Sequence, residues 1–171
     1  FWKVVEPQLP RIMEGFYAHV TRERHLAALI GNDMARLKAA QGTHWGRLFN
    51  GRFDAAYMQS IRTIGLVHNK IGLEPKWYIG GYNYVAGELV RLAGAAHRWR
   101  RGRLTATLRA VNSAINLDMA LAISVYQEAM LAERQQREDK VTTAISEFDA
   151  QMKMAIETVS TSSARMQETA N

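Results

Sequence analysis

The 171-residue sequence contains no cysteine and only three prolines. The missing cysteines exclude a disulfide scaffold, a cysteine-ligated zinc or iron–sulfur site and a thiol nucleophile. No stretch reaches the ~20 consecutive apolar residues of a membrane span, because Asn, Asp and Glu side chains interrupt even the apolar region 110–130. The start of the chain also lacks the pattern of a signal peptide. We therefore expect a cytoplasmic fragment of a longer protein, without a membrane partner.

Acidic residues are missing from the segment 89–117, which carries six arginines. The rest of the chain balances, with 16 basic against 16 acidic residues, so this segment accounts for the whole net charge of +6. A DNA- or RNA-binding helical domain is one possible interpretation, through Arg98, Arg100, Arg101 and Arg103. No recognition helix is evident in the sequence, however, and basic loops on helical proteins are usually solvated. We expect no nucleic-acid partner.

The sequence has none of the common enzyme signatures. It lacks the Gly-Xaa-Ser-Xaa-Gly elbow, the phosphate-binding loop, the dinucleotide fingerprint and the His-Glu-Xaa-Xaa-His metal motif. Its carboxylates are spread along the chain and do not cluster near histidines. These absences predict a protein that is not an enzyme.

Apolar residues recur at helical spacing through most of the chain. One predicted helix carries this pattern at Leu9, Met13, Phe16 and Val20. A second carries it at Ile61, Ile64, His68 and Ile71. Gly72 is placed to stop that helix, and Pro75 to open the next one. The pattern predicts an all-α domain from about residue 5 to residue 135.

A long helix is expected after Arg103, and its apolar face is unusually wide. One stripe consists of Leu104, Leu108, Val111, Ile115, Met119, Ala122, Tyr126 and Met130. A second stripe beside it consists of Leu117, Leu121 and Val125. A helix that covers one small core needs a single apolar face of about 100°. The second stripe therefore predicts a homodimer built on this helix.

The last part of the chain, after a charged stretch at 133–140, has a single apolar seam. It consists of Val141, Ile145, Phe148, Met152, Ile156 and Val159, whose five steps average 3.6 residues. This spacing is typical of a coiled coil or of a helix that enters a bundle. We expect the seam to pack on a second copy of the chain or on a further domain.

His68 differs from the other four histidines because it lies in phase with the isoleucines of an apolar helix face. His19, His25 and His97 are expected at the surface, and His44 at the start of a helix. Two interpretations of His68 remain open from its position alone. It is either a hydrogen-bonded core histidine or the single axial ligand of a haem, whose porphyrin supplies the four in-plane ligands.

The run HNKIGLEPKWYIG, residues 68–80, resembles the proximal-histidine region of the globin-coupled sensors. The pattern of that family is His-Xaa-Xaa-Ile-Gly-Leu-Xaa-Pro-Xaa-Trp-Tyr-Xaa-Gly, and every fixed position is matched. Upstream, the pairs His44-Trp45 and Leu48-Phe49, with Gly51 after them, are similar to its helix-E region. Phe16-Tyr17 is similar to the aromatic pair on its B helix. The resemblance covers about residues 5 to 135.

The resemblance implies a haem-binding sensor globin domain at 1–135, followed at 136–171 by a helical linker into a signalling domain outside this sequence. The implied cofactor is haem b (iron protoporphyrin IX). His68 becomes its axial metal ligand, and Tyr17 the distal hydroxyl that donates a hydrogen bond to O₂. Tyr78 becomes the tyrosine on the proximal side, with Trp77 packed beside it.

One departure from the family concerns a second distal donor. Some aerotaxis members carry a threonine 28 residues before the axial histidine, and this chain has Ala40 there. The neighbouring Gln41 is a polar side chain that can take its place.

The function implied is a haem-based oxygen sensor, with CO and NO as further possible ligands. The family forms a homodimer through a four-helix interface, here the helices around 82–96 and 104–135. Residues 141–171, with the run VTTAISEF at 141–148 and a later Ala-Xaa-Met spacing, resemble the entry to a methyl-accepting chemotaxis signalling helix. This implies an aerotaxis transducer that acts on a chemotaxis histidine kinase and its coupling protein. The alternative is the same sensor driving a diguanylate cyclase or histidine kinase. An oxygen store or dioxygenase with no signalling role is a further possibility.

Overall fold

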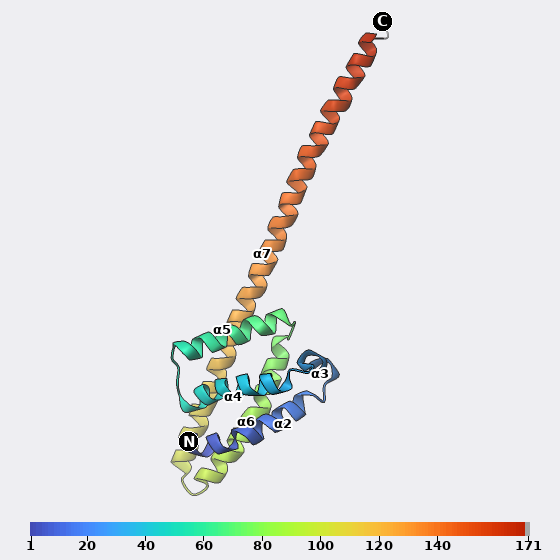
Figure 1. Ribbon diagram of the computed structural model, residues 1–171. Coiled ribbons are helices and arrows are strands. Elements are labelled where there is room, and N and C mark those ends of the chain that lie inside the picture. The colour runs from blue at the N-terminus through green and yellow to red at the C-terminus, as the bar shows by residue number, and fades with distance from the viewer. Residues whose placement is uncertain (170–171) are drawn as a thin grey trace. The chain divides into compact units, whose positions relative to one another are not determined.

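The computed structural model describes residues 1–169, and all regular structure within that range is helical (Figure 1). This confirms the predicted all-α, globin-like class with a long C-terminal helix. The elements in chain order are α1 (Trp2–Val5), the short 3-10 helix η1 (Glu6–Gln8), α2 (Leu9–Val20), α3 (Arg24–Ile30), α4 (Met34–Asn50), α5 (Ala55–Lys70), α6 (Pro75–His97) and α7 (Arg101–Thr169).

Local sequence signals set the ends of the helices around the site. Gly51 adopts a φ of +79° just after α4, in the left-handed region that glycine enters most easily. Asp54 caps α5, because its carboxylate accepts a hydrogen bond of 2.9 Å from the backbone N–H of Tyr57. Pro75 occupies the first turn of α6 as predicted. This helix therefore begins seven residues before the range 82–96 that the resemblance implied for the interface.

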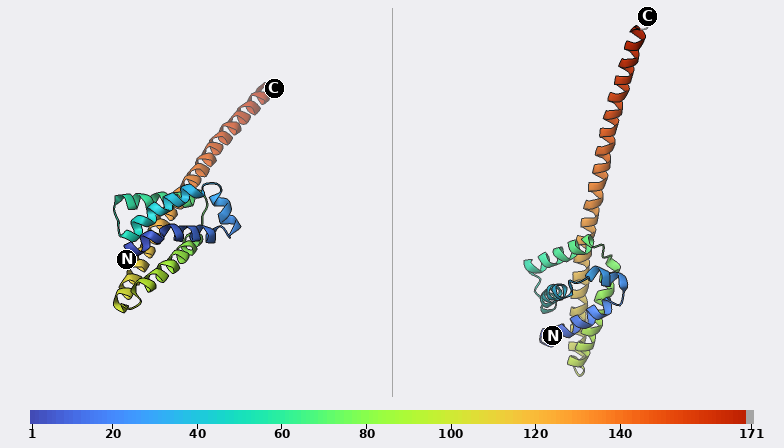
Figure 2. Two further views of the ribbon diagram at one scale, coloured as in Figure 1. Left: turned by 60° about the horizontal axis from the view of Figure 1, so that its bottom comes forward. Right: turned by 45° about the vertical axis from the view of Figure 1, so that its right-hand side comes forward.

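The helices α2, α4, α5, α6 and the first part of α7 share one buried core. Its largest fully buried side chains include Trp45, Tyr57 and Leu89. Helix α2 packs against α6 and α4, and α4 packs against α5. In each view α2 lies beside α6 (Figures 1 and 2). The start of the chain lies near the end of α6, where the rings of Phe1 and His97 are 6.2 Å apart.

Gly65 allows a close crossing of α5 and α7. A Cβ atom at this position would lie 2.7 Å from Cβ of Val125 and 2.9 Å from the carbonyl oxygen of Ala122. Val125 and Leu121, two members of the second apolar stripe, pack against the core of their own chain in this way. Leu117, the third member, remains 44% exposed. Leu117 is thus the most exposed member of this stripe, whereas Leu121 and Val125 are partly buried by their own chain.

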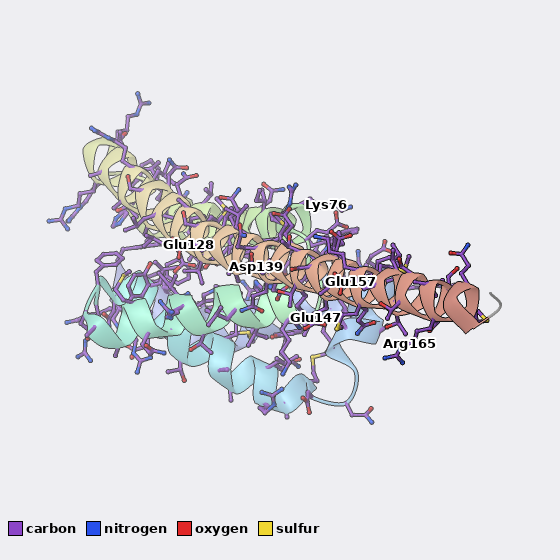
Figure 3. All side chains as sticks on the ribbon, turned by 90° about the horizontal axis from the view of Figure 1, so that it is seen from above. Lys76, Glu128, Asp139, Glu147, Glu157 and Arg165 are labelled. Atoms are coloured by element: carbon purple, nitrogen blue, oxygen red, sulfur yellow. The ribbon has the colours of Figure 1, made fainter. Side chains whose placement is uncertain are left out.

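The chain divides into two compact units, residues 1–129 and 130–171. Within the second unit α7 continues as a single helix to Thr169. Asp139, Glu147 and Glu157 lie along this part of the helix (Figure 3). The predicted seam is exposed along its whole length, with Phe148 at 62% and Val159 at 69%. Among residues 1–169 no helix combines the length and apolarity that a membrane crossing requires.

Candidate functional site

A cavity of about 700 Å³ lies inside the first unit. Its lining comes from α2, α3, α4, α5 and α6 and is mostly aliphatic and aromatic. The four site residues predicted from the sequence, His68, Tyr17, Trp77 and Tyr78, all line it. The fold therefore gathers side chains that are up to 61 positions apart in the sequence around one cavity.

His68 lies in the last turn of α5, and the end of that helix holds it in place. The backbone N–H of Leu73 donates to the His68 carbonyl at 2.9 Å, and that of Gly72 donates to Asn69 at 3.0 Å. These two bonds form a Schellman motif, which requires the positive φ of +71° at Gly72. The Ile-Gly-Leu part of the motif thus serves a structural need, because it ends α5 one turn after the imidazole.

Burial lowers the pKa of His68 to about 4. The imidazole is consequently neutral at physiological pH, with a lone pair on one ring nitrogen. A neutral imidazole is the form that ligates iron and other transition metals. His68 therefore presents to the cavity a neutral imidazole, the protonation state that an axial ligand requires.

Tyr17 reaches the cavity from α2 and is only 7% exposed. Burial raises the pKa of its hydroxyl to about 12, so the group stays protonated and can donate a hydrogen bond. The ring of Phe16 meets it edge-on at 5.2 Å. Gly81 on α6 makes room for Phe16, because a Cβ there would lie 3.0 Å from the phenyl ring. Gly81 thus gives Phe16 its space, and Phe16 in turn packs against the ring that carries the Tyr17 hydroxyl.

Ala40 and Gln41 both line the cavity from α4. Ala40 has no hydrogen-bonding atom in its side chain, so it cannot act as the second donor found in some relatives. Gln41 contributes a polar amide to the lining and is the neighbouring candidate for that role.

Trp77 and Tyr78 lie in the first turn of α6, directly after the helix start that Pro75 sets. The ring of Tyr78 contacts the ring of His68 at 5.1 Å, with an angle of 64° between their planes. Lys76, on the same turn (Figure 3), lies over the ring of Trp77 at 5.4 Å and forms an ion pair of 2.7 Å with Glu74. Tyr78 is thus the side chain that joins His68 to the rest of α6.

The structure also reveals a buried carboxylate that the sequence analysis did not single out. Asp118 of α7 is fully buried and accepts hydrogen bonds from the hydroxyls of Tyr57, Tyr78 and Tyr82. Nε2 of His44 lies 2.9 Å from its Oδ1 atom, although the ring is not aligned for a hydrogen bond. We call these five residues the Asp118 cluster. Its signal in the sequence was an aspartate in phase with Ile115 and Ala122, on an otherwise apolar face.

Two opposing effects act on the pKa of Asp118. Burial is the largest and raises it, whereas the nearby His44 and the hydroxyls of Tyr82 and Tyr57 lower it. The net result is a pKa below the usual range of aspartate, so the carboxylate is charged. Burial, followed by the charge of Asp118 and the hydrogen bond to it, raises the pKa of Tyr78 well above its usual range.

His44 was expected at the start of a helix, and this prediction was wrong. It lies inside α4, 1% exposed, with its ring stacked on Tyr57 at 5.7 Å. Its Nδ1 atom is 2.9 Å from the hydroxyl of Ser60. The Asp118 cluster explains the difference, because it provides polar contacts for a histidine in the middle of a helix. His19 and His25 are exposed as predicted.

The cavity suits a flat, largely apolar ring with a metal at its centre. Its volume lies within the ~300–1,000 Å³ of small-molecule sites. Arg36 and Arg47 also line it and can pair with propionate groups, although Arg36 already forms an ion pair of 2.6 Å with Asp33. The buried indole N–H groups of Trp45 and Trp77 have no hydrogen-bond partner within residues 1–169, and both residues line the cavity. Iron protoporphyrin IX offers a metal for His68 and an apolar ring for the lining.

A family model described as protoglobin matches residues 1–132. The chain belongs to the protoglobin family. Protoglobins bind haem and gases, so the first unit is a globin-type haem sensor domain. The match covers the whole cavity and the whole Asp118 cluster. Within this protoglobin domain, the motif at residues 68–80 resembles the proximal region of the globin-coupled sensors.

Proposed function

We propose that this protoglobin domain binds haem b with His68 as the axial ligand and reports the presence of O₂. The observation that carries the proposal is the neutral His68 imidazole in the wall of a 700 Å³ apolar cavity, with the Tyr17 hydroxyl in the same cavity. Haem, when bound there, supplies an iron centre that binds diatomic gases reversibly. CO and NO are further ligands of such a centre.

The residues of the chain then have separate roles. His68 holds the cofactor, and the apolar lining excludes water. Tyr17 presents a neutral O–H donor, which favours a bound gas with partial negative charge, such as O₂, over CO. A hydrogen bond to a charged acceptor contributes about 1.5–3 kcal/mol, which corresponds to about one to two decades in affinity. Trp77 and Tyr78 close the proximal side.

Absorption spectra of the purified protein under argon, O₂ and CO test this proposal. Three distinct ferrous spectra with an intense Soret band are expected for the wild-type protein. His68→Ala should lose that band, because no other residue is proposed as an axial ligand. His25→Ala, which changes an exposed histidine that does not line the cavity, is the matched control and should keep all three spectra. A normal ferrous spectrum in His68→Ala would refute the assignment.

The signalling role is part of the same proposal. The chain acts as a cytoplasmic homodimer through the helices around 82–96 and 104–135, and α7 carries the signal into residues 136–171. Two observations support this. Helix α7 holds Asp118 in the core and continues to Thr169, and the seam at 141–159 is exposed and apolar. The output is control of a signalling module and not catalysis by these residues.

The output we favour is aerotaxis, through a chemotaxis histidine kinase and its coupling protein. The alternative is a diguanylate cyclase or histidine kinase joined to the same sensor. Determining the full-length protein by mass spectrometry separates them. A methyl-accepting signalling domain after residue 171 supports the transducer, and a cyclase or kinase domain supports the alternative.

A further inference from the structure

The Asp118 cluster joins four helices through one carboxylate. Tyr57 comes from α5, Tyr78 and Tyr82 come from α6, and His44 comes from α4, whereas Asp118 itself belongs to α7. The hydroxyl of Tyr57 donates to Oδ1 at 2.9 Å. The hydroxyls of Tyr78, at 2.9 Å, and Tyr82 donate to Oδ2. No other buried charged residue of α7 lies within residues 101–167.

The carboxylate has little capacity for further partners. An ionised aspartate has about four acceptor positions. Three hydroxyls donate to it, and the His44 ring lies 2.9 Å from Oδ1. When a buried carboxylate loses one hydrogen-bond donor, water cannot replace the lost bond. The helix that carries the carboxylate, or another donor, must therefore move. The position of α7 is consequently tied to the positions of these side chains.

Tyr78 differs from the other donors because its ring also contacts His68, at 5.1 Å. Tyr57 donates to the same carboxylate, but its ring stacks on His44 and does not line the cavity. One donor thus contacts the proposed axial ligand, and the other does not. Both rings bury an O–H group against one aspartate, so the pair forms a matched comparison within the cluster.

We propose that Asp118 couples the cavity to α7, with the Tyr78 hydroxyl as the contact through which a displacement of His68 changes the hydrogen bonds of this carboxylate and so the position of the helix. This inference rests on the proposed function, in which His68 holds the cofactor and α7 carries the signal. It assigns to Asp118 and Tyr78 a role as positioning residues. Asp118 is then the group on α7 that receives the signal.

The test compares Tyr78→Phe with Tyr57→Phe in the purified, haem-loaded protein. Each variant removes one hydroxyl from Asp118 and keeps the aromatic ring. The measurement is amide hydrogen exchange along residues 111–125, in the ferrous protein with and without CO. We expect CO to change exchange in the wild type and in Tyr57→Phe. In Tyr78→Phe the change should shrink by about twofold or more, although CO still binds.

Several outcomes would overturn the inference. An equal loss of the CO effect in both variants would mean that the cluster only stabilises the fold. An undiminished effect in Tyr78→Phe would mean that the signal reaches α7 by another route. Melting temperatures of the two variants, measured in parallel, show whether they differ in stability alone. If they melt alike but respond differently to CO, a purely structural role is excluded.

Asp118→Asn provides an independent measurement. The amide keeps the shape of the side chain but offers one acceptor oxygen in place of two. We expect this variant to bind CO and to show no CO effect on exchange along α7; a wild-type effect would contradict the inference. If Asp118→Asn does not fold, the comparison of Tyr78→Phe with Tyr57→Phe still tests the inference. Failure of the proposed function is distinguishable, because it appears as a missing Soret band before any exchange is measured.

Discussion

The proposed role of Tyr17 in gas selectivity depends on a single hydrogen bond, donated by its hydroxyl. Burial keeps it protonated, with a pKa of about 12. Tyr17→Phe removes the donor and keeps the ring, so we expect O₂ to dissociate about 10–100-fold faster while CO dissociation changes little. Flash photolysis and stopped-flow mixing measure both rates.

The control for this prediction is Tyr84→Phe. Tyr84 lies on the same side of the core and contacts Phe16 at 6.4 Å, but it does not line the cavity. Its hydroxyl should therefore have no effect on either rate. Equal acceleration of O₂ and CO release in Tyr17→Phe would show that the substitution opens the cavity and that Tyr17 is not a selective donor.

The charge on Asp118 makes stability depend on pH. Its pKa is lowered in the folded state, because the surrounding donors outweigh the effect of burial. The carboxylate therefore stabilises the fold above its unfolded pKa of about 4. That contribution is lost as the pH falls from there through the lowered folded pKa. The groups that face it are His44 on α4, Tyr57 on α5, and Tyr78 and Tyr82 on α6.

Urea unfolding of the wild type and Asp118→Asn at a series of pH values measures this dependence. We expect Asp118→Asn to be less stable at pH 7, and the difference between the two proteins to become smaller below about pH 4. Comparing the two proteins removes the contribution of the other carboxylates. A difference that stays constant with pH would mean that Asp118 is not charged in the native state.

At the level of elements, the crossing of α5 and α7 depends on the missing side chain of Gly65. A Cβ atom here would meet Val125 at 2.7 Å and the Ala122 carbonyl at 2.9 Å, both closer than normal contacts. Gly65→Ala should lower the free energy of unfolding by about 1–3 kcal/mol, because the helices must separate to fit the methyl group. Urea unfolding followed by circular dichroism measures this loss.

Gly46→Ala is the matched control for the crossing. Gly46 also lies inside a helix, α4, but the nearest atom to an added Cβ is 4.0 Å away, on Trp2. Alanine is the better helix former by up to about 1 kcal/mol, so this variant should be as stable as the wild type or more so. A similar loss in both variants would argue against a steric cause at Gly65.

At the level of the whole molecule, the proposed homodimer predicts a specific sensitivity. Leu117 on α7 is 44% exposed and lies in the helix proposed for the interface. Leu117→Glu should weaken the dimer, because it places a charge in an apolar contact. Sedimentation velocity at several protein concentrations measures the association.

Leu66→Glu is the control for the dimer prediction. Leu66 on α5 is exposed to almost the same extent, 43%, but lies outside the proposed interface. It should leave association unchanged. A wild-type protein that sediments as a monomer, or equal effects of both variants, would contradict the proposed interface.

Signal transmission predicts a change in α7 that extends beyond the core. Amide exchange along residues 104–135 should differ between the O₂-bound and ligand-free proteins, because the proposed mechanism has the ligand shift an equilibrium between two positions of α7. Mass spectrometry of the exchanged peptides measures it. Identical exchange in the two states would exclude this route, while leaving haem and gas binding at His68 untouched.

The sequence predicted much of this protein because its signals are local. Helical spacing, the glycine stop at Gly72 and the proline start at Pro75 act within a few residues, and they appear in the structure as predicted. The motif from His68 to Gly80 is a contiguous run, so the resemblance to a haem-binding globin family could also be recognised from the sequence. The roles of His68, Tyr17, Trp77 and Tyr78 remain predictions, although all four line one cavity.

Tertiary structure alone decided which polar residues meet in the core. Asp118 and Tyr57 are 61 positions apart, and His44, which was assigned to a helix start, lies inside α4 and meets this carboxylate. A buried carboxylate depends on donors from other helices, and periodicity says nothing about how those helices are rotated against one another. The second apolar stripe shows the same limit. Its width suggested a partner subunit, but the crossing at Gly65 buries part of it within the chain.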